Sequence, residues 1–349
     1  MAVAGAGAFG KNHLRVCREL ETAGLGVALV AAVEPDAVRA ADAAARYAIP
    51  IFASVDELLA ADLRLDAAIV AVPTVQHHAV ASALLDARLD LLVEKPLATS
   101  LAETDNLIRR AEKGKRILQP GHLERFNPAV LAVEPRLHRP MFFEAHRLSV
   151  FTPRALDVDV VLDLMIHDLD IVLIFAASPV REVRAVGLPI LSPKVDIANV
   201  RVEFESGCVA NFTASRVSTE RVRKLRFFEP RQYVSIDYAR QDSLVIRLDL
   251  GAAAIAAGKL DPAALAKLAA ATGSAGPVPG LSFAKPPVTP GEPLRLEMES
   301  FFDSVRTRRE PRVTARQGRN ALALALEIQA SMASHAHRAG LDNFFMPGA

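Results

Sequence analysis

The first ten residues, Met1-Ala-Val-Ala-Gly-Ala-Gly-Ala-Phe-Gly10, decide the fold of the N-terminal part of this chain. A short apolar run leads into glycines spaced G-x-G-x-x-G, and a helical pattern follows. Between a strand and a helix, such glycines allow a tight turn, close approach of the backbone to a pyrophosphate, and close packing of helix on strand. The stretch predicts a dinucleotide site whose cofactor contacts are Gly5, Gly7, Ala8, Phe9 and Gly10.

An acidic residue follows at the position where this kind of site needs one. Glu34 ends the second predicted strand, 24 residues after Gly10. A carboxylate there accepts hydrogen bonds from the adenosine ribose and repels a 2′-phosphate, which favours NAD over NADP. The alternative to a cofactor site is an Ala/Gly-rich turn without a ligand. The strand, the helix and the acidic residue all occur at the positions that a cofactor site requires.

Short apolar runs alternate with longer Ala-rich helical stretches from residue 1 to about 120. This alternation is typical of βαβ units around a parallel sheet. The expected strands are Met1–Ala4, Gly26–Val33, Ala67–Val72, Asp90–Val93 and Arg116–Leu118. Because the first strand is so short, we expect the natural chain to begin a few residues earlier.

The pattern changes after Gly121, where strands with alternating faces follow one another with few helices between them. The sequence therefore predicts an α+β domain over 121–349 with a mostly antiparallel sheet. Its expected strands are Phe142–Leu148, Val183–Gly187, Asn199–Phe204, Cys208–Ser215, Lys224–Phe228 and Tyr233–Asp237, with one helix from about Val158 to Ala176. An Ala-, Pro- and Gly-rich segment, Gly251–Pro290, is predicted to be a flexible insertion or linker. Helices over Pro293–Thr307 and Ala315–His337 close the chain and can pack back on the first domain.

Composition excludes several classes of protein. The 349 residues carry 41 basic and 40 acidic side chains, a net charge of +1, without a long run of like charge, which argues against nucleic-acid or membrane-surface binding. Cys17 and Cys208 form neither a disulfide framework nor a zinc motif, so we expect no metal and a reducing, cytoplasmic location. No export signal or membrane-spanning stretch is expected.

Glu94-Lys95-Pro96 follows the strand Asp90–Val93, at the carboxyl end of the sheet, where open α/β folds bind their ligands. An ammonium there can orient a substrate hydroxyl and stabilise negative charge on its oxygen. By itself this tripeptide is weak evidence, because a lysine after a strand is usually a solvated loop residue.

The second candidate group lies on the predicted helix, where Asp163 and His167 are four residues apart and share one face. This pair suits a general base with an orienting carboxylate, since histidine can accept a hydroxyl proton near neutral pH. A structural histidine in a helix whose acids favour the dipole is an equally good interpretation of the pair alone. A zinc site fits worse because no further ligands accompany the pair.

Taken in order, these motifs resemble the Gfo/Idh/MocA oxidoreductase family along nearly the whole chain. The similarity rests on Gly5–Gly10, Val72-Pro73-Thr74 with His77, Glu94-Lys95-Pro96, and Asp163-x3-His167-x2-Asp170. It implies a Rossmann domain followed by an open-faced, mainly antiparallel sheet used for substrate and often oligomer contacts. A homodimer or homotetramer is therefore expected.

The resemblance also implies roles for individual residues. Lys95 and His167 become the catalytic pair, and Asp163 orients the substrate or the histidine. Pro73, Thr74 and His77 are placed beside the cofactor, and Glu94 near the nicotinamide ribose. One departure is Met165, where many members have glycine.

Two stretches, 121–128 and 157–168, are similar to the nucleotide-sugar branch, in particular bacterial UDP-N-acetylglucosamine 3-dehydrogenases, whose ketone product is aminated for lipid A. The substrate expected from this similarity is a UDP-sugar. The candidates to contact its diphosphate or sugar are Arg125, Asn127, Arg147 and Arg154, since guanidinium pairs bidentately with phosphate; each arginine could equally be a salt-bridge partner. The alternatives are an inositol or free-sugar dehydrogenase of the same family and a non-catalytic nicotinamide-binding regulator.

Overall fold

The computed structural model describes residues 1–152, 158–248 and 281–341. The chain forms two compact units, each built on its own sheet. The first comprises Met1–Asn127 and Gly291–Glu327, and the second comprises Pro128–Pro290 and Ile328–Ala349. The first unit is thus discontinuous in sequence, whereas the sequence-based division had one boundary at residue 120 and C-terminal helices that can pack back on the first domain.

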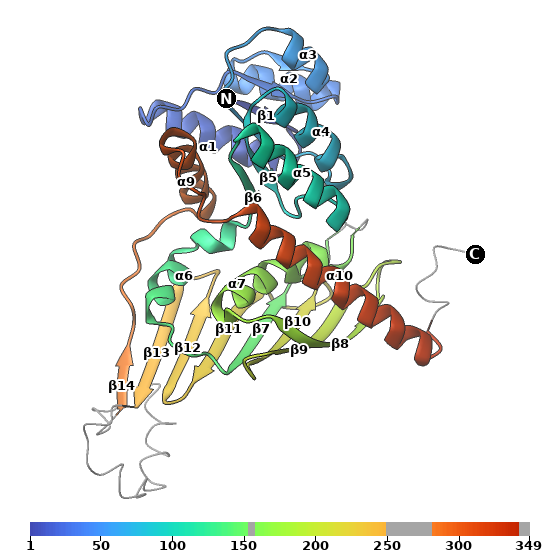
Figure 1. Cartoon of the computed structure of the whole chain (residues 1–349), viewed down its shortest axis with the longest axis vertical. Helices are drawn as coiled ribbons and strands as arrows, with labels where there is room; N and C mark the ends of the chain where they lie inside the picture. The colour runs from blue at the N-terminus through green and yellow to red at the C-terminus, as the bar shows by residue number, and fades with distance from the viewer. Residues whose placement is uncertain (153–157, 249–280, 342–349) are drawn as a thin grey trace, which may run out of the picture. The chain divides into compact units, whose positions relative to one another are not determined.

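The first unit contains a parallel sheet in the order β3-β2-β1-β4-β5-β6, drawn in blue to green in Figure 1. Its strands are β1 (Ala2–Ala4), β2 (Ala31–Val33), β3 (Ile51–Phe52), β4 (Ala67–Val70), β5 (Asp90–Glu94) and β6 (Leu118–Gly121). Its helices are α1 (Gly10–Thr22), α2 (Ala37–Tyr47), α3 (Val55–Ala60), α4 (Thr74–Asp86), α5 (Leu101–Gly114), the 3-10 turn η1 (Leu123–Phe126), α9 (Pro293–Thr307) and the first part of α10 (Ala315–Arg338). This is a doubly wound fold.

Two apolar clusters form the core of this unit, one on each face of the sheet, because successive strand residues point to opposite faces. Val3 belongs to one cluster, and Ala2 and Ala4 belong to the other. The cluster around Val3 also takes in Met298 and Phe301 of α9, both fully buried. Helix α9 therefore completes the core of the first unit, each such side chain contributing about 1.5–3 kcal/mol.

The sheet of the second unit runs in the order β14-β13-β12-β11-β7-β10-β9-β8. Its strands are β7 (Phe142–Leu148), β8 (Val180–Leu188), β9 (Ile197–Phe204), β10 (Val209–Ser215), β11 (Val222–Glu229), β12 (Gln232–Asp237), β13 (Asp242–Leu248) and β14 (Leu281–Ala284). Among the ladders in the described residues, β7 and β10 pair in parallel and the other strands pair antiparallel. The predicted fold class is confirmed.

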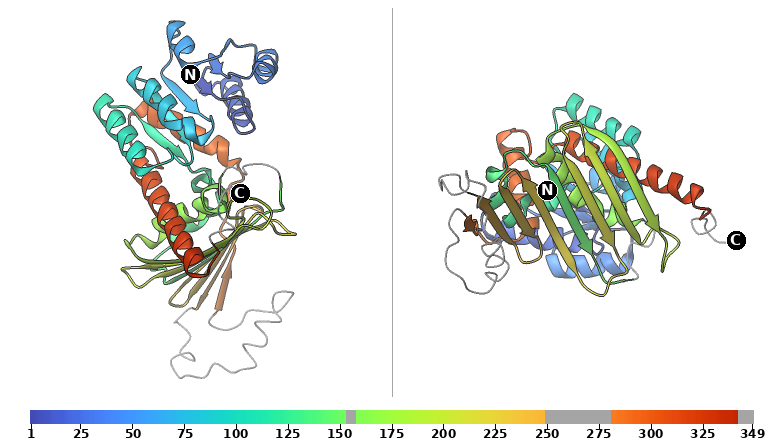
Figure 2. Two further views of the ribbon diagram at one scale, coloured as in Figure 1. Left: turned by 90° about the vertical axis from the view of Figure 1, so that its right-hand side faces the viewer. Right: turned by 90° about the horizontal axis from the view of Figure 1, so that it is seen from below.

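Helices cover one face of this second sheet. In β7, Phe143, Ala145 and Arg147 are buried and alternate with half-buried neighbours, and α7 (Ile166–Ala176) lies over the sheet in Figure 1. The right-hand view of Figure 2 shows the opposite face, with no described helix of this unit in front of the strands. The other helical elements are α6 (Pro128–Val133), η2 (Glu134–Arg136), the π-helix η3 (Val161–Met165) and the end of α10 (Ala315–Arg338).

Three strands escaped the sequence analysis. β3 has only two residues, and β13 carries three consecutive apolar residues, Leu244-Val-Ile246, that hide its alternation. β14 was wrongly included in the predicted linker; its four residues pair with β13, while 251–280 lie outside the described residues. In the described helices we find no stretch long and apolar enough to cross a membrane.

Candidate functional site

The glycine loop has the three properties that a dinucleotide site requires. Gly5 has a φ of +97°, and a Cβ there would lie 2.5 Å from the carbonyl oxygen of Ala71. A Cβ on Gly10 would lie 1.9 Å from the carbonyl oxygen of Gly5, so α1 packs directly on the turn. At Gly7 a Cβ would meet nothing within 4 Å. The backbone of Gly7 therefore faces open space that a ligand can approach closely.

Two helices begin at the carboxyl ends of β1 and β4 without a side-chain cap. The residue before α1 is Phe9 and the residue before α4 is Pro73, and neither helix has an acidic residue in its first turn. The positive end of the helix dipole, which no side-chain cap or acidic residue offsets here, favours an anion. The second of these helices, α4, begins at Thr74. The carboxyl edge of the sheet, where both helices begin, therefore suits the pyrophosphate of a dinucleotide.

Glu34 lies just past the end of β2. Its Oε2 accepts a hydrogen bond from the Ala6 N–H (2.8 Å), and its Oε1 accepts bonds from the Asp36 N–H (3.0 Å) and the Arg39 guanidinium (2.9 Å). Burial alone would raise the pKa of Glu34, but these bonds outweigh it and lower the pKa. The carboxylate is charged at neutral pH, as a ribose-binding acid must be, and the sequence analysis missed its partner Arg39.

The two sequence neighbours of Lys95, Glu94 and Pro96, are buried and contact buried histidines. Glu94 Oε1 lies 2.7 Å from His13 Nε2, and the Lys95–Pro96 peptide is cis. On the far side, His77 Nδ1 lies 2.8 Å from the carbonyl oxygen of Pro96, and its Nε2 lies 2.9 Å from that of Val72. Burial lowers the pKa of His77, so its neutral ring donates to one carbonyl at a time. His77 therefore lies between the loop after β4 and the loop after β5 and donates a hydrogen bond to a carbonyl of one of them.

The second unit contains the other predicted catalytic residues. His167 is the second residue of α7, and Asp163 lies in the π-helix η3, so the single α-helix expected from Val158 to Ala176 is wrong in its first part. Asp159 Oδ1 accepts hydrogen bonds from the N–H groups of Val161 and Leu162 and so starts the wide turn. Asp163 and His167 are half-buried, whereas Met165 between them is buried. π-turns often mark functional sites.

Arg147 is held inside the second unit. Its Nε and Nη2 donate to the two carboxylate oxygens of Asp168 at 2.7 and 3.0 Å, and both side chains are buried. Its guanidinium also lies over the ring of Tyr238, with Cζ 5.1 Å from the centroid. This bidentate pair anchors the first turn of α7, next to His167, to strand β7.

The remaining substrate candidates lie elsewhere. Arg125 is buried in the first unit, where its Nη2 donates to the carbonyl oxygen of Arg312 at 3.4 Å. Asn127 is also buried there and donates to Glu124 at 3.0 Å. Arg154 lies outside the described residues. The structure thus gives Arg125, Asn127 and Arg147 internal partners and does not bring all three together in one unit.

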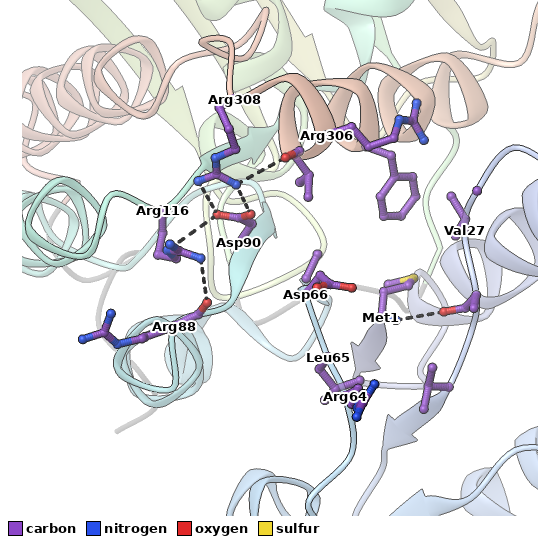
Figure 3. A pocket seen from close by; sticks show the side chains of 16 residues that line it. Met1, Val27, Arg64, Leu65, Asp66, Arg88, Asp90, Arg116, Arg306 and Arg308 are labelled. Atoms are coloured by element: carbon purple, nitrogen blue, oxygen red, sulfur yellow. Dashed lines mark hydrogen bonds and ion pairs between the residues drawn. The ribbon is translucent and has the colours of Figure 1, made fainter.

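A cavity of about 480 Å³ lies at the opposite edge of the first sheet (Figure 3). Its walls include Met1, Ala67 and Asp90, at the amino ends of β1, β4 and β5. Figure 3 shows the Asp90 carboxylate paired with Arg308 and Arg116. Because doubly wound sheets bind ligands at their carboxyl ends, this cavity is separate from the glycine-loop site. Nowhere in the described parts of the chain do three or more His, Cys, Asp or Glu residues cluster as metal ligands.

Comparison with known proteins identifies the class. The model of the oxidoreductase family with an NAD-binding Rossmann fold (Gfo/Idh/MocA) matches residues 1–122, and the model of the Gfo/Idh/MocA C-terminal domain matches residues 129–231. The chain belongs to this family, as the motifs indicated. UDP-N-acetylglucosamine 3-dehydrogenase from Acidithiobacillus ferrooxidans is 31% identical over 95% of this chain and 98% of that protein.

Solved structures agree with this assignment. A structure of the same A. ferrooxidans enzyme matches with a TM-score of 0.82 and 30% identity, covering 95% of this chain and 97% of that one. The WlbA dehydrogenase from Bordetella pertussis, solved with NADH and UDP-GlcNAcA, shares the fold at 16% identity (TM-score 0.74, 96% of each chain). By sequence, inositol 2-dehydrogenase from Acidothermus cellulolyticus is a further relative, 33% identical over 52% of this chain and 54% of its own length.

Replacing Gly7 with valine is expected to weaken NAD binding about tenfold or more, a loss of at least about 1.4 kcal/mol. The isopropyl group would enter the space that a pyrophosphate needs, and its Cβ would have no protein atom within 4 Å. Calorimetric titration with NAD⁺ and thermal unfolding measure the two effects. Gly10→Ala is the control and should lower the melting temperature. An unchanged affinity in Gly7→Val would contradict the assignment of this loop.

Proposed function

We propose that this protein is an NAD-dependent dehydrogenase that oxidises UDP-N-acetylglucosamine at its 3-hydroxyl to a ketone, a step toward amino sugars of lipid A. One observation carries the choice of substrate. The similarity to UDP-N-acetylglucosamine 3-dehydrogenase extends over 95% of the chain, whereas the A. cellulolyticus inositol dehydrogenase matches only 52%. Because substrate pockets vary on a common fold, similarity that includes both units bears more strongly on the substrate.

In the proposed reaction, NAD, when bound, would supply the acceptor for the hydride that leaves the sugar carbon. His167 accepts the hydroxyl proton on an imidazole nitrogen, and Lys95 donates a hydrogen bond to the same oxygen as the carbonyl forms. Asp163 orients the imidazole or the sugar. The half-buried positions of Asp163 and His167, in contrast to buried Asp168 and Asp170, support their assignment as the residues that meet substrate.

The proposed cofactor site consists of the glycine loop, Glu34, the start of α4 and the residues around Lys95. Pro73 is exposed and Thr74 half-buried, as suits residues beside a ligand. Glu94 is buried and accepts a hydrogen bond from His13. In its proposed place near the nicotinamide ribose, Glu94 therefore also keeps an internal hydrogen bond. The family description and the uncapped helices support NAD as the cofactor.

Replacing Glu34 with serine is expected to raise the preference for NADP over NAD by about tenfold or more. The substitution removes the charge that repels a 2′-phosphate and releases the Arg39 guanidinium, now 2.9 Å from that carboxylate, to pair with the phosphate. The measurement is the ratio of kcat/KM for the two cofactors. The double variant Glu34→Ser, Arg39→Ala should lose the gain, and an unchanged ratio in Glu34→Ser would oppose NAD selection by this residue.

The substrate is tested with purified protein, NAD⁺, a carbonyl trap, and a panel of UDP-sugars, inositols and free hexoses. NADH formed only with UDP-N-acetylglucosamine is the expected result. NADH formed with inositols or free sugars instead would overturn the nucleotide-sugar assignment and leave the dehydrogenase class intact. If NAD binds and no compound is oxidised, the non-catalytic regulator becomes the better interpretation.

The uncovered face of the second sheet suits the expected homodimer or homotetramer. Cross-strand pairing aligns a row of apolar side chains on this face, namely Val209, Phe142, Phe228, Tyr233, Ile246 and Phe283. Five of these side chains are half-buried and Phe283 is exposed, and a contiguous, partly exposed apolar row of this kind is typical of protein contacts. Sedimentation analysis tests the assembly, and the proposed cytoplasmic location agrees with two buried free cysteines.

A further inference from the structure

We propose that His13 is a positioning residue that holds Lys95 in place through Glu94. The inference rests on the proposed catalytic role of Lys95. His13 belongs to none of the motifs that the sequence analysis singled out, yet its side chain is fully buried and bonded to the residue that precedes Lys95.

The contact between His13 and Glu94 has defined donors and acceptors. Glu94 Oε1 lies 2.7 Å from His13 Nε2, and a carboxylate oxygen can only accept, so Nε2 carries the hydrogen. The other ring nitrogen, Nδ1, is buried and has no hydrogen-bond partner in the described part of the chain. A hydrogen on Nδ1 would be buried unpaired, so the geometry assigns the Nε2–H tautomer.

Glu94 has little freedom to move. A Cβ at Gly121, on the neighbouring strand β6, would lie 3.1 Å from Cα, Cδ and Oε2 of Glu94. Glu94 therefore packs closely against the backbone of Gly121, and a side chain at position 121 would press on the carboxylate. On the other side of Lys95, the carbonyl oxygen of Pro96 lies 2.8 Å from Nδ1 of buried His77. Buried histidines therefore contact both sequence neighbours of Lys95.

His13 also connects Lys95 to the glycine loop. It lies one turn into α1, and its ring contacts that of Phe9 edge to face, with centroids 5.6 Å apart. Phe9 is 40% exposed and belongs to the predicted cofactor loop. A continuous set of contacts thus runs from Phe9 through His13 to Glu94, all within the first unit.

The test compares three variants. His13→Leu removes the donor, His13→Gln keeps an N–H near the position of Nε2, and Cys17→Ala perturbs the same buried face of α1 one turn later without touching Glu94. His13→Leu should lower kcat about 10- to 100-fold, because small misplacements of a reacting group cost this much. His13→Gln should recover most of kcat. Cys17→Ala should lower the melting temperature while kcat stays close to that of the unaltered protein.

A second readout requires no turnover. The rate at which an amine-specific reagent labels Lys95, followed by mass spectrometry of the full chain, should change several-fold in His13→Leu and return toward the original rate in His13→Gln. Unchanged labelling in His13→Leu, or equal effects in His13→Leu and Cys17→Ala, would overturn the proposal. The variant Lys95→Ala separates the catalytic role of Lys95 from the positioning role of His13. Full turnover in that variant would refute the catalytic role of Lys95, whereas the labelling result still decides whether His13 positions Lys95.

Discussion

His167→Asn is expected to lower kcat about 10²- to 10⁴-fold, the usual contribution of a general base. Asparagine is close to histidine in size but cannot take a proton from the sugar hydroxyl. NAD⁺ affinity should hardly change, because the glycine loop belongs to the other unit. Steady-state kinetics with UDP-N-acetylglucosamine and calorimetric titration with NAD⁺ measure the two quantities.

His146→Asn provides a matched control for this experiment. His146 lies in β7 of the same unit, half-buried on the sheet face opposite to Ala145 and Arg147. Its replacement should leave kcat within about threefold, the range of surface substitutions of less than about 0.5 kcal/mol. Similar losses in both variants, or no loss in His167→Asn, would refute the assignment of His167 as the base.

Arg147→Met is expected to destabilise the protein by about 3–5 kcal/mol, because breaking a buried ion pair leaves its partner charge without compensation. Arg147 and Asp168 are both buried and share two hydrogen bonds, and the Tyr238 ring packs on the guanidinium. Denaturant unfolding measures the loss. The double variant Arg147→Met, Asp168→Leu removes both charges and should recover part of it.

The same experiment decides between two roles for Arg147. If its guanidinium bound the substrate diphosphate, Arg147→Met would raise KM for the UDP-sugar and barely alter stability. Exposed Arg201 on β9 is the control, and its replacement should change stability by less than about 0.5 kcal/mol. A large KM effect in a stable Arg147→Met protein would contradict the internal role.

The parts of the site that are local in sequence could be predicted. The spacing of Gly5, Gly7 and Gly10 predicts a tight turn, a close approach to a ligand and close packing of helix on strand, and the structure gives each glycine the surroundings expected of it. Glu34 and Lys95 could be placed because both directly follow buried strands, and the carboxyl ends of parallel strands lie at one edge of the sheet.

Long-range pairing could not be predicted. The sequence does not indicate that both carboxylate oxygens of Asp168 accept hydrogen bonds from Arg147, 21 residues earlier. Nor does it indicate that His13 contacts Glu94, 81 residues later. The π-turn at η3 was missed because apolar spacing over five residues does not separate α-helical from i→i+5 hydrogen bonding. The sequence analysis expected α9 to pack back on the first domain but could not name the surface it covers, since an apolar helix face fits any apolar surface.

The discontinuity of the first unit has a consequence for biosynthesis. A ribosome that has released residues 1–127 has made all six strands of the parallel sheet but not α9, which covers part of the core around Val3. Until Met298 and Phe301 emerge, that apolar surface faces water and is prone to aggregation. The N-terminal unit should therefore finish folding late in translation, and a nascent chain stalled before α9 should depend on chaperones.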